Sequence, residues 1–251
     1  MSGRPALEAV VFDAGGTLVR LDFEWMSGAL RGLGHDVGPA ALRRAEVAGR
    51  RAFEASLDAA ARDAAGAPTL GARGDIRRYF AAMLEEAGVP AGLVDPALAR
   101  FYEREQGRGL WTRPAEGARA CMDELAALGL RLACISNSNG RAAEHLATCD
   151  VRRGLEFVVD SAVEGVEKPD PAIFRIALDR LGVPAARALY VGDLRLVDGR
   201  GAGGAGLHFV LLDPHGDYAA PGEAAIDGIA RLPGWVAENF TPVAGSARAG
   251  H

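Results

Sequence analysis

Short apolar segments alternate with helical segments over residues 116–212, and this alternation constrains the fold more than any other feature. Helices are predicted at 116–128 and 141–148, and a third, opened by Pro169 and Pro171, runs to Leu181. Strands are predicted at 130–135, 157–159, 188–191 and 207–212. Because parallel strands are usually joined by helical crossovers, the pattern indicates a parallel sheet with helices on both faces.

One more strand is predicted apart from this series, at residues 8–14, where the apolar run EAVVFDA ends at Gly15-Gly16. A helical stretch rich in Ala and Arg follows, from about residue 24 to 105, with breaks at 38–39, 66–68 and 88–92. The sequence therefore predicts an α/β fold, a doubly wound parallel-sheet (Rossmann-like) core with a helical domain inserted after its first strand. We expect the core at 1–19 and 110–245, the insertion at 20–109 and a disordered tail at 246–251.

The composition is that of an ordinary globular protein, with 49% hydrophobic and 24% charged residues. A net charge of -5 gives no electrostatic reason to expect nucleic acid or an anionic membrane as a partner. No apolar run reaches the roughly 18 residues of a membrane span, and no secretory signal is visible, so a cytoplasmic location is expected. Cys121, Cys134 and Cys149 are too scattered for a zinc site and are expected to be buried thiols.

Polar residues follow four of the predicted strands. Asp13 follows the first strand and Ser136 ends the second, Lys168 lies in the loop after the third, and Asp193 and Asp198 follow the fourth. In a doubly wound sheet, ligands bind outside the carboxyl ends of the strands. Each residue alone would be an ordinary turn, cap or surface residue, but the ordered set predicts that they converge on one site.

The set is chemically coherent for phosphoryl transfer. Clustered carboxylates repel one another unless a cation lies among them, and hard oxygen ligands select Mg²⁺. A carboxylate such as Asp13 can attack phosphorus and form an aspartyl-phosphate. Lys168, Ser136, Thr17 and the backbone of Gly15-Gly16 would supply positive charge and donors to the phosphoryl group.

These four segments resemble the motifs of the haloacid dehalogenase superfamily of hydrolases, from residue 8 to about 212. The matching segments are VVFDAGGTL (10–18), CISNSNG (134–140), EKPDPAIF (167–174) and YVGDLRLVDGRGAGGAG (190–206). The resemblance implies that Asp13 is the nucleophile and that Lys168 steadies it. It implies Mg²⁺ as cofactor, with Asp193 as a ligand and Asp198 as a ligand or a nearby acceptor.

The resemblance also implies the rest of the site. Ser136 and Asn137, with Gly16 and Thr17, would bind the substrate, and the Gly15 carbonyl would join the metal ligands. The helical insertion corresponds to the family's small cap domain, which shapes substrate choice. The interval of about 30 residues between Ser136 and Lys168 is too short for the larger α/β cap of other members.

One position departs from the family pattern. Phosphatases of this family usually carry a second Asp two residues after the nucleophile as general acid and base, and Gly15 stands there instead. General acid–base catalysis is typically worth about 10² to 10⁴ in rate, so alkyl phosphates should be poor substrates and aryl or acyl phosphates better ones. Asp22, Glu24 and His35 are possible substitutes, although exposure at the surface is favoured for each.

A second departure is Leu194-Arg195 after the metal-binding Asp193, where a small polar residue is common. This bulky pair would crowd the pocket or present a cation to the substrate, and a surface arginine is the favoured interpretation.

We therefore expect a Mg²⁺-dependent phosphatase that acts on a small phosphorylated metabolite. One alternative is a 2-haloacid dehalogenase, in which Asp13 attacks carbon without a metal and Arg20 is the nearby candidate for halide; the Asp193 and Asp198 pair argues for phosphate. Another is a catalytically weakened binding protein, which the substitution at Gly15 motivates. Neither the substrate nor the oligomeric state is predicted.

Overall fold

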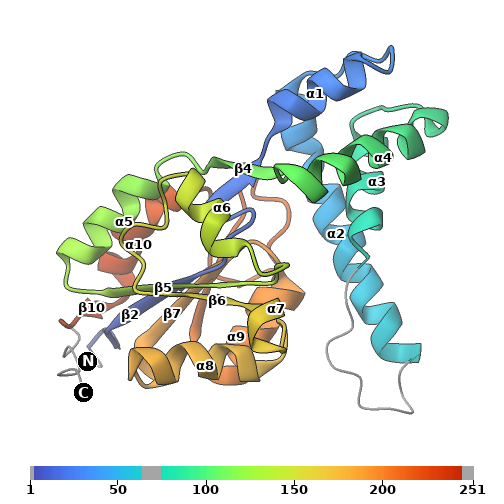
Figure 1. The fold of residues 1–251 in the computed structure, drawn as a ribbon. Helices are drawn as coiled ribbons and strands as arrows, with labels where there is room; N and C mark the ends of the chain where they lie inside the picture. The colour runs from blue at the N-terminus through green and yellow to red at the C-terminus, as the bar shows by residue number, and fades with distance from the viewer. Residues whose placement is uncertain (1–2, 64–74, 245–251) are drawn as a thin grey trace. The chain divides into compact units, whose positions relative to one another are not determined.

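The structure is a computed structural model that describes residues 3–63 and 75–244, with the side chains of 58–63 left out (Figure 1). The chain divides into two compact units, residues 1–20 with 113–251, and residues 21–112. The predicted tail at 246–251 and the predicted break at 66–68 lie outside the described residues. No helix in the described part of the chain is long and apolar enough to cross a membrane.

A six-stranded parallel sheet forms the centre of the first unit, in the order β6-β5-β2-β7-β8-β9. Its strands are β2 (Ala9–Phe12), β5 (Arg131–Ser136), β6 (Val158–Asp160), β7 (Ala188–Gly192), β8 (His208–Leu212) and β9 (Ala225–Ile226). In chain order the strands run 3-2-1-4-5-6, which is the doubly wound, Rossmann-like arrangement. The predicted fold class is confirmed.

Helices cover both faces of this sheet (Figure 1). They are α5 (Ala118–Ala127), α6 (Ala142–Thr148), α7 (Ser161–Glu164), α8 (Pro171–Leu181), α9 (Arg200–Ala205) and α10 (Leu232–Asn239). Helices α8 and α9 lie on one face, and α5 and α10 lie on the other. Every residue of β2 and β7 is buried, because a sheet covered on both faces needs apolar side chains throughout.

Local sequence explains where helix α8 begins and ends. Asp170 caps its N-terminus by accepting a hydrogen bond from the backbone N–H of Ala172, and Pro171 occupies the first turn. Gly182 ends the helix in a left-handed conformation, with φ of 65°. Between them, Ile173, Phe174 and Leu181 are fully buried against the sheet.

Several short elements were not predicted. Strands β1 (Ala6–Leu7) and β10 (Thr241–Pro242) pair with each other, as do β3 (Val19–Leu21) and β4 (Trp111–Pro114). A π-helical turn covers Arg195–Gly199, and 3-10 turns cover Ala185–Arg187 and Ile229–Arg231. Elements of two to five residues are too short to show a hydrophobic period, so the sequence does not reveal them.

The second unit is helical and has its own apolar core. Its helices are α1 (Phe23–Arg31), α2 (Pro39–Asp63), α3 (Ile76–Glu86) and α4 (Ala91–Gly107). Tyr79 and Phe101 belong to this buried core, and Trp25 and Phe53 are partly buried and pack against it. These four aromatic side chains therefore contribute to the packing of the helical unit.

Candidate active site

Asp13 and Asp193 leave neighbouring strands at the same edge of the core sheet. Strand β2 pairs with β7 so that Phe12 lies opposite Val191, which places Asp13 beside the end of β7. The chain builds β5 and β6 on one side of β2 and β7 to β9 on the other, so the winding reverses between β2 and β7. Open α/β sheets bind ligands at such a switch point.

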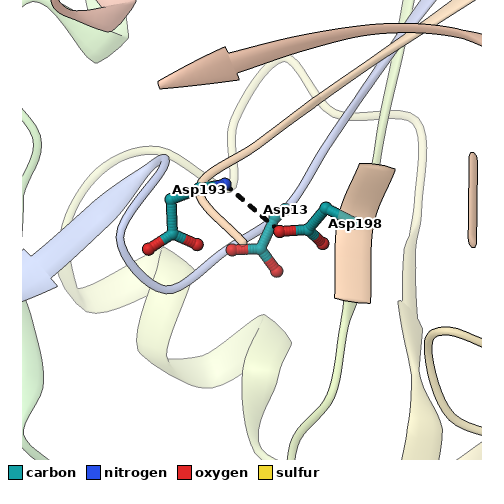
Figure 2. A group of neighbouring side chains, drawn as sticks. All are labelled: Asp13, Asp193 and Asp198. Carbon is teal, nitrogen blue, oxygen red and sulfur yellow. Dashed lines mark hydrogen bonds between the residues drawn. The ribbon is translucent and has the colours of Figure 1, made fainter. Parts of the chain in front are cut away.

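Asp13, Asp193 and Asp198 form a compact, buried cluster at this edge (Figure 2). One carboxylate oxygen from each residue lies within 4.8 Å of those of the other two. The exposed fractions of the three residues are only 6%, 5% and 1%. Buried carboxylates this close repel one another, and their hard oxygen atoms are the ligands that Mg²⁺ prefers. The donor set therefore fits a divalent cation.

Two glycines make room for this cluster. A Cβ atom on Gly16 would lie 2.1 Å from Asp193 Oδ2, and its φ of 82° is in the region that favours glycine. A Cβ atom on Gly192 would lie 2.5 Å from the carboxyl carbon of Asp198. Any larger residue at either position would displace one of the two carboxylates.

Lys168 brings a buried positive charge into the cluster from the loop before α8. Its Nζ donates hydrogen bonds to Asp13 Oδ1 at 2.5 Å, Asp198 Oδ1 at 2.7 Å and the Tyr190 hydroxyl at 3.0 Å. An ammonium has three N–H donors, and these acceptors match all three. Burial lowers the pKa of Lys168, but the carboxylates of Asp13 and Asp198 outweigh it and raise that pKa above its usual range. Lys168 is therefore charged at every physiological pH.

The Asp13 carboxylate is less acidic than an ordinary aspartate. Burial raises its pKa from 3.8 to about 6, Lys168 opposes that rise, and the charge of Asp198 adds to it. At neutral pH the group is mostly ionised, as a nucleophile must be.

Asp198 is saturated with hydrogen bonds. Its Oδ1 accepts from Lys168 and, at 3.3 Å, from the Tyr190 hydroxyl. Its Oδ2 accepts from the backbone N–H of Asp193 at 3.1 Å (the dashed line in Figure 2) and of Leu194 at 3.0 Å. Four donors fill the acceptor sites of a carboxylate. Of the two roles expected for Asp198, this geometry favours the nearby acceptor over the direct metal ligand.

Ser136 ends strand β5, on the other side of β2, and Asn137 follows it. Cys134 lies opposite Phe12, so Ser136 is at the level of the turn that follows Asp13, and it is 7% exposed. The Asn137 side chain contacts the backbone of Lys168, and its predicted contact with substrate stays a prediction. Its Oδ1 accepts from the Lys168 N–H and its Nδ2 donates to the Lys168 carbonyl, both at 2.8 Å.

The turn after Asp13 contains the other predicted site residues. Gly15 pairs with Val19 in a single β-bridge. Gly16 donates its N–H to the Val19 carbonyl at 2.7 Å. Thr17 has no exposed surface, and its hydroxyl has no hydrogen-bond partner among the described residues. The structure therefore buries the hydroxyl that was predicted to contact substrate, and that contact stays a prediction.

The structure also bears on the candidates for a substitute acid. Asp22 caps helix α1 by accepting from the Trp25 N–H, and it forms a buried ion pair with Arg104 at 2.7 Å. Surface exposure was the favoured expectation for Asp22, and it is wrong: the residue is only 5% exposed, because the helix cap and Arg104 hold its carboxylate inside the helical unit. Arg195, next to the cluster in sequence, pairs with Glu223 at 2.7 Å.

Tyr190 is the site residue that sequence reasoning missed. It is fully buried in β7, where its ring packs edge-on against Phe174 and its hydroxyl contacts Lys168 and Asp198. Burial raises its pKa well above the usual value, and the nearby carboxylates raise it further, so the hydroxyl stays protonated. A hydroxyl-bearing residue within the otherwise apolar strand ALYVG was the available signal.

A Rossmann-like sheet with this carboxylate and lysine cluster at its switch point fits a hydrolase that uses a carboxylate as nucleophile. A model of the haloacid dehalogenase-like hydrolase family matches residues 7–206, and the chain belongs to that family.

Two curated relatives illustrate the similarity in sequence. Haloacid dehalogenase-like hydrolase domain-containing protein 3 of Mus musculus is 37% identical over 127 residues, which cover 50% of each chain. Phosphoglycolate phosphatase of Pseudomonas savastanoi pv. phaseolicola is 30% identical over 157 residues, which cover 62% of this chain and 56% of that protein. The chain thus spans about half the length of the curated relatives that it matches.

Solved structures share the fold. L-2-haloacid dehalogenase from Xanthobacter autotrophicus has a TM-score of 0.56 and 22% identity, covering 92% of this chain and 98% of that one. A putative hydrolase of the same family from Bacillus subtilis, bound to magnesium, has a TM-score of 0.57 and 18% identity, covering 94% of this chain and 100% of that one. At these identities the similarity concerns the fold alone.

Proposed function

We propose that this protein is a Mg²⁺-dependent phosphatase that acts on a small phosphorylated metabolite with Asp13 as its nucleophile. The observation that carries the proposal is the buried ion pair of Asp13 and Lys168 inside a three-carboxylate cluster. The similarity to a phosphoglycolate phosphatase supports phosphate esters as the substrate class. The helical unit, residues 21–112, would act as the cap that selects the substrate.

Charge and donor chemistry support a divalent cation. Three carboxylates and one ammonium leave two negative charges in the cluster, which a doubly charged ion would balance. Asp13 and Asp193 would hold the ion directly with the Gly15 carbonyl, while Asp198 holds Lys168 and the loop after β7. Bound Mg²⁺ would offset the charge of the phosphoryl oxygens and orient the nucleophile.

The residues of the chain would then perform two displacements. An oxygen of Asp13 attacks phosphorus, forming an acyl phosphate while the bond to the leaving oxygen breaks. Water attacks the same phosphorus next, which releases inorganic phosphate and restores the carboxylate. In both steps Lys168 offsets negative charge, and the Ser136 hydroxyl donates a hydrogen bond to a phosphoryl oxygen.

Gly15 would limit the range of substrates. With glycine two residues after the nucleophile, no side chain there can protonate the leaving oxygen. Activated aryl or acyl phosphates, whose leaving groups depart as anions, are the favoured substrates.

The test is hydrolysis of p-nitrophenyl phosphate with Mg²⁺ by the natural protein and by Asp13→Asn. Asp179→Asn, the same change at an exposed position on α8, is the matched control. We expect the control to retain activity and Asp13→Asn to lose it by at least about a thousandfold. Equal rates for Asp13→Asn and the natural protein would end the proposal.

A second candidate is a 2-haloacid dehalogenase, in line with the similarity of fold to such an enzyme. A halide leaves without protonation, so Gly15 would not handicap this reaction. The Asp193 carboxylate opposes it, because displacement at carbon needs no metal and therefore no second ligand beside Asp13. Halide release from chloroacetate without Mg²⁺ would decide for the dehalogenase.

A further inference from the structure

We infer that Asn137 is a positioning residue that sets the Lys168 ammonium against Asp13, rather than a residue whose side chain binds substrate. The inference rests on the proposed phosphatase function. Its basis is the two-point contact in which the Asn137 amide both accepts from and donates to the backbone of Lys168 at 2.8 Å.

The contact fixes the backbone from which the long Lys168 side chain extends. A lysine side chain has a flexible stem of four carbons. Its ammonium is therefore placed accurately only if the backbone is held as well as the ammonium itself. The Lys168 ammonium is held by hydrogen bonds to Asp13, Asp198 and Tyr190. Asn137 holds the backbone, and a complementary pair of hydrogen bonds resists both sliding and rotation. A misplacement of about 1 Å in a catalytic group can lower the rate a hundredfold.

The Asn137 side chain is itself carried by a braced loop. Asp160, at the end of β6, accepts hydrogen bonds from the N–H groups of Gly140 and Ala142, each at 3.0 Å. The Ser161 hydroxyl accepts from the Ser138 N–H at 3.0 Å and donates to its carbonyl at 3.3 Å. Asp160 and Ser161 therefore hold the loop that follows Ser136. The backbone that carries Asn137 is fixed as a result.

This arrangement couples two groups that the reaction uses together. Asn137 follows Ser136 directly, so one amide links the proposed phosphoryl-binding hydroxyl to the proposed charge-balancing ammonium. The distance between the Ser136 hydroxyl and the Lys168 ammonium is therefore constrained by the peptide bond that joins Ser136 to Asn137 and by the two hydrogen bonds of the Asn137 amide. A substrate that engaged the Asn137 amide would have to compete with the backbone of Lys168.

The first experiment compares Asn137→Ala with Asn139→Ala, the same change two residues along the same loop. Steady-state hydrolysis of p-nitrophenyl phosphate with Mg²⁺ should show kcat reduced about 10- to 100-fold in Asn137→Ala, with KM changed less than threefold. Asn139→Ala should keep both constants. Asn137→Gln retains an amide but moves it by one CH₂, so it should resemble Asn137→Ala. A raised KM with unchanged kcat would overturn the inference.

A double-mutant cycle separates positioning from direct contact. In a Lys168→Met background, Asn137→Ala should lower kcat/KM no further, because the group that it positions is gone. A loss of the same size in both backgrounds would show that Asn137 acts on the substrate itself and would overturn the inference.

A third measurement does not depend on turnover. Lys168 is the sole lysine of the chain, so acetylation by an amine-reactive ester, followed by peptide mass spectrometry, reports on its ammonium alone. We expect the acetylation rate to rise at least about fivefold in Asn137→Ala and to stay unchanged in Asn139→Ala. Equal rates in all three proteins would reject the contact as a positioning device. If the natural protein hydrolyses no phosphate ester, the proposed function fails while this measurement still decides the role of Asn137.

Discussion

At the scale of single residues, Lys168 shows why charge alone does not define the site. The sequence contains 28 Lys and Arg residues, and the sole lysine is the one enclosed by Asp13, Asp198 and Tyr190. An ammonium is compact and has three donors, which match three acceptors around one point, whereas a guanidinium is planar and larger. The requirement is for geometry as much as for positive charge.

We therefore expect Lys168→Arg to lower kcat/KM for p-nitrophenyl phosphate by at least about a hundredfold, although it conserves the charge. Arg180→Lys, the reverse exchange on the exposed side of α8, is the control and should keep its activity. Activity in Lys168→Arg within threefold of the natural protein would show that any cation suffices there.

Tyr190 gives a prediction about stability. Tyr190→Phe keeps the packing against Phe174 but leaves a donor of the buried Lys168 ammonium without its acceptor. An unsatisfied buried polar group costs about 1 to 3 kcal/mol, so the free energy of unfolding should fall by that amount. Urea denaturation measures it, with Tyr102→Phe at a 68% exposed position as the control. No difference between the two variants would contradict the prediction.

The pKa of Asp13 predicts how metal binding depends on pH. This pKa is about 6 in the folded protein against 3.8 for an ordinary aspartate. Without metal, the raised pKa of Asp13 stabilises the folded protein. This stabilisation is complete below pH 3.8 and is lost as the pH rises through about 6. Because a metal needs the ionised carboxylate, Mg²⁺ affinity should fall about tenfold per pH unit below that pKa. Calorimetric titrations at pH 5 and pH 8 test this, and equal affinities would contradict it.

Sequence reasoning could place the charged residues of the site but not all of their contacts. Asp13, Lys168, Asp193 and Asp198 lie at strand ends or in the following loops, and parallel strands bring such ends to one edge. The contact between Asn137 and the Lys168 backbone depends on which way two loops face, and no local pattern encodes that.

At the scale of elements, the end of β6 braces the loop that carries Ser136. The Asp160 carboxylate accepts from three backbone N–H groups, those of Gly140, Ala142 and Ala162. We expect Asp160→Ala to lower the free energy of unfolding by about 2 to 4 kcal/mol, because three partly buried donors lose their acceptor. Asp170→Ala, which removes a single cap from α8, should cost about 1 kcal/mol. Chemical denaturation compares the two, and equal losses would argue against the brace.

The predicted elements succeed where a period or a cap is local. The apolar runs that form β5 and β8, and the helix α8 that proline opens and that ends at Leu181, were predicted from the sequence. The pairs β1 with β10 and β3 with β4 join residues far apart in the sequence and are too short to show alternation. Their existence depends on tertiary context rather than on their own sequence.

At the scale of the whole molecule, two compact units are joined where the chain passes between residues 20 and 21 and again between 112 and 113. All residues of the carboxylate and lysine cluster belong to the first unit. Metal binding should therefore stabilise that unit first.

A ligand that binds only the folded state, at one hundred times its dissociation constant, adds about 2.7 kcal/mol to the free energy of unfolding. We expect Mg²⁺ to raise Tm accordingly and a chelator to reverse the effect. Asp193→Asn should abolish the rise, while its metal-free form should be at least as stable as the natural protein, because one charge of a repelling cluster is gone. Scanning calorimetry measures the Tm of both proteins with and without Mg²⁺. A Tm of the natural protein that does not change with Mg²⁺ would contradict the proposed cofactor.

The lone lysine has a practical consequence for spectroscopy. Cells fed lysine enriched in ¹⁵N at the side-chain nitrogen would produce a protein with one labelled amine, located between Asp13 and Asp198. A single resonance, free of overlap and obtained without any substitution, would then follow ion binding, proton transfer and the arrival of a ligand at the centre of the site.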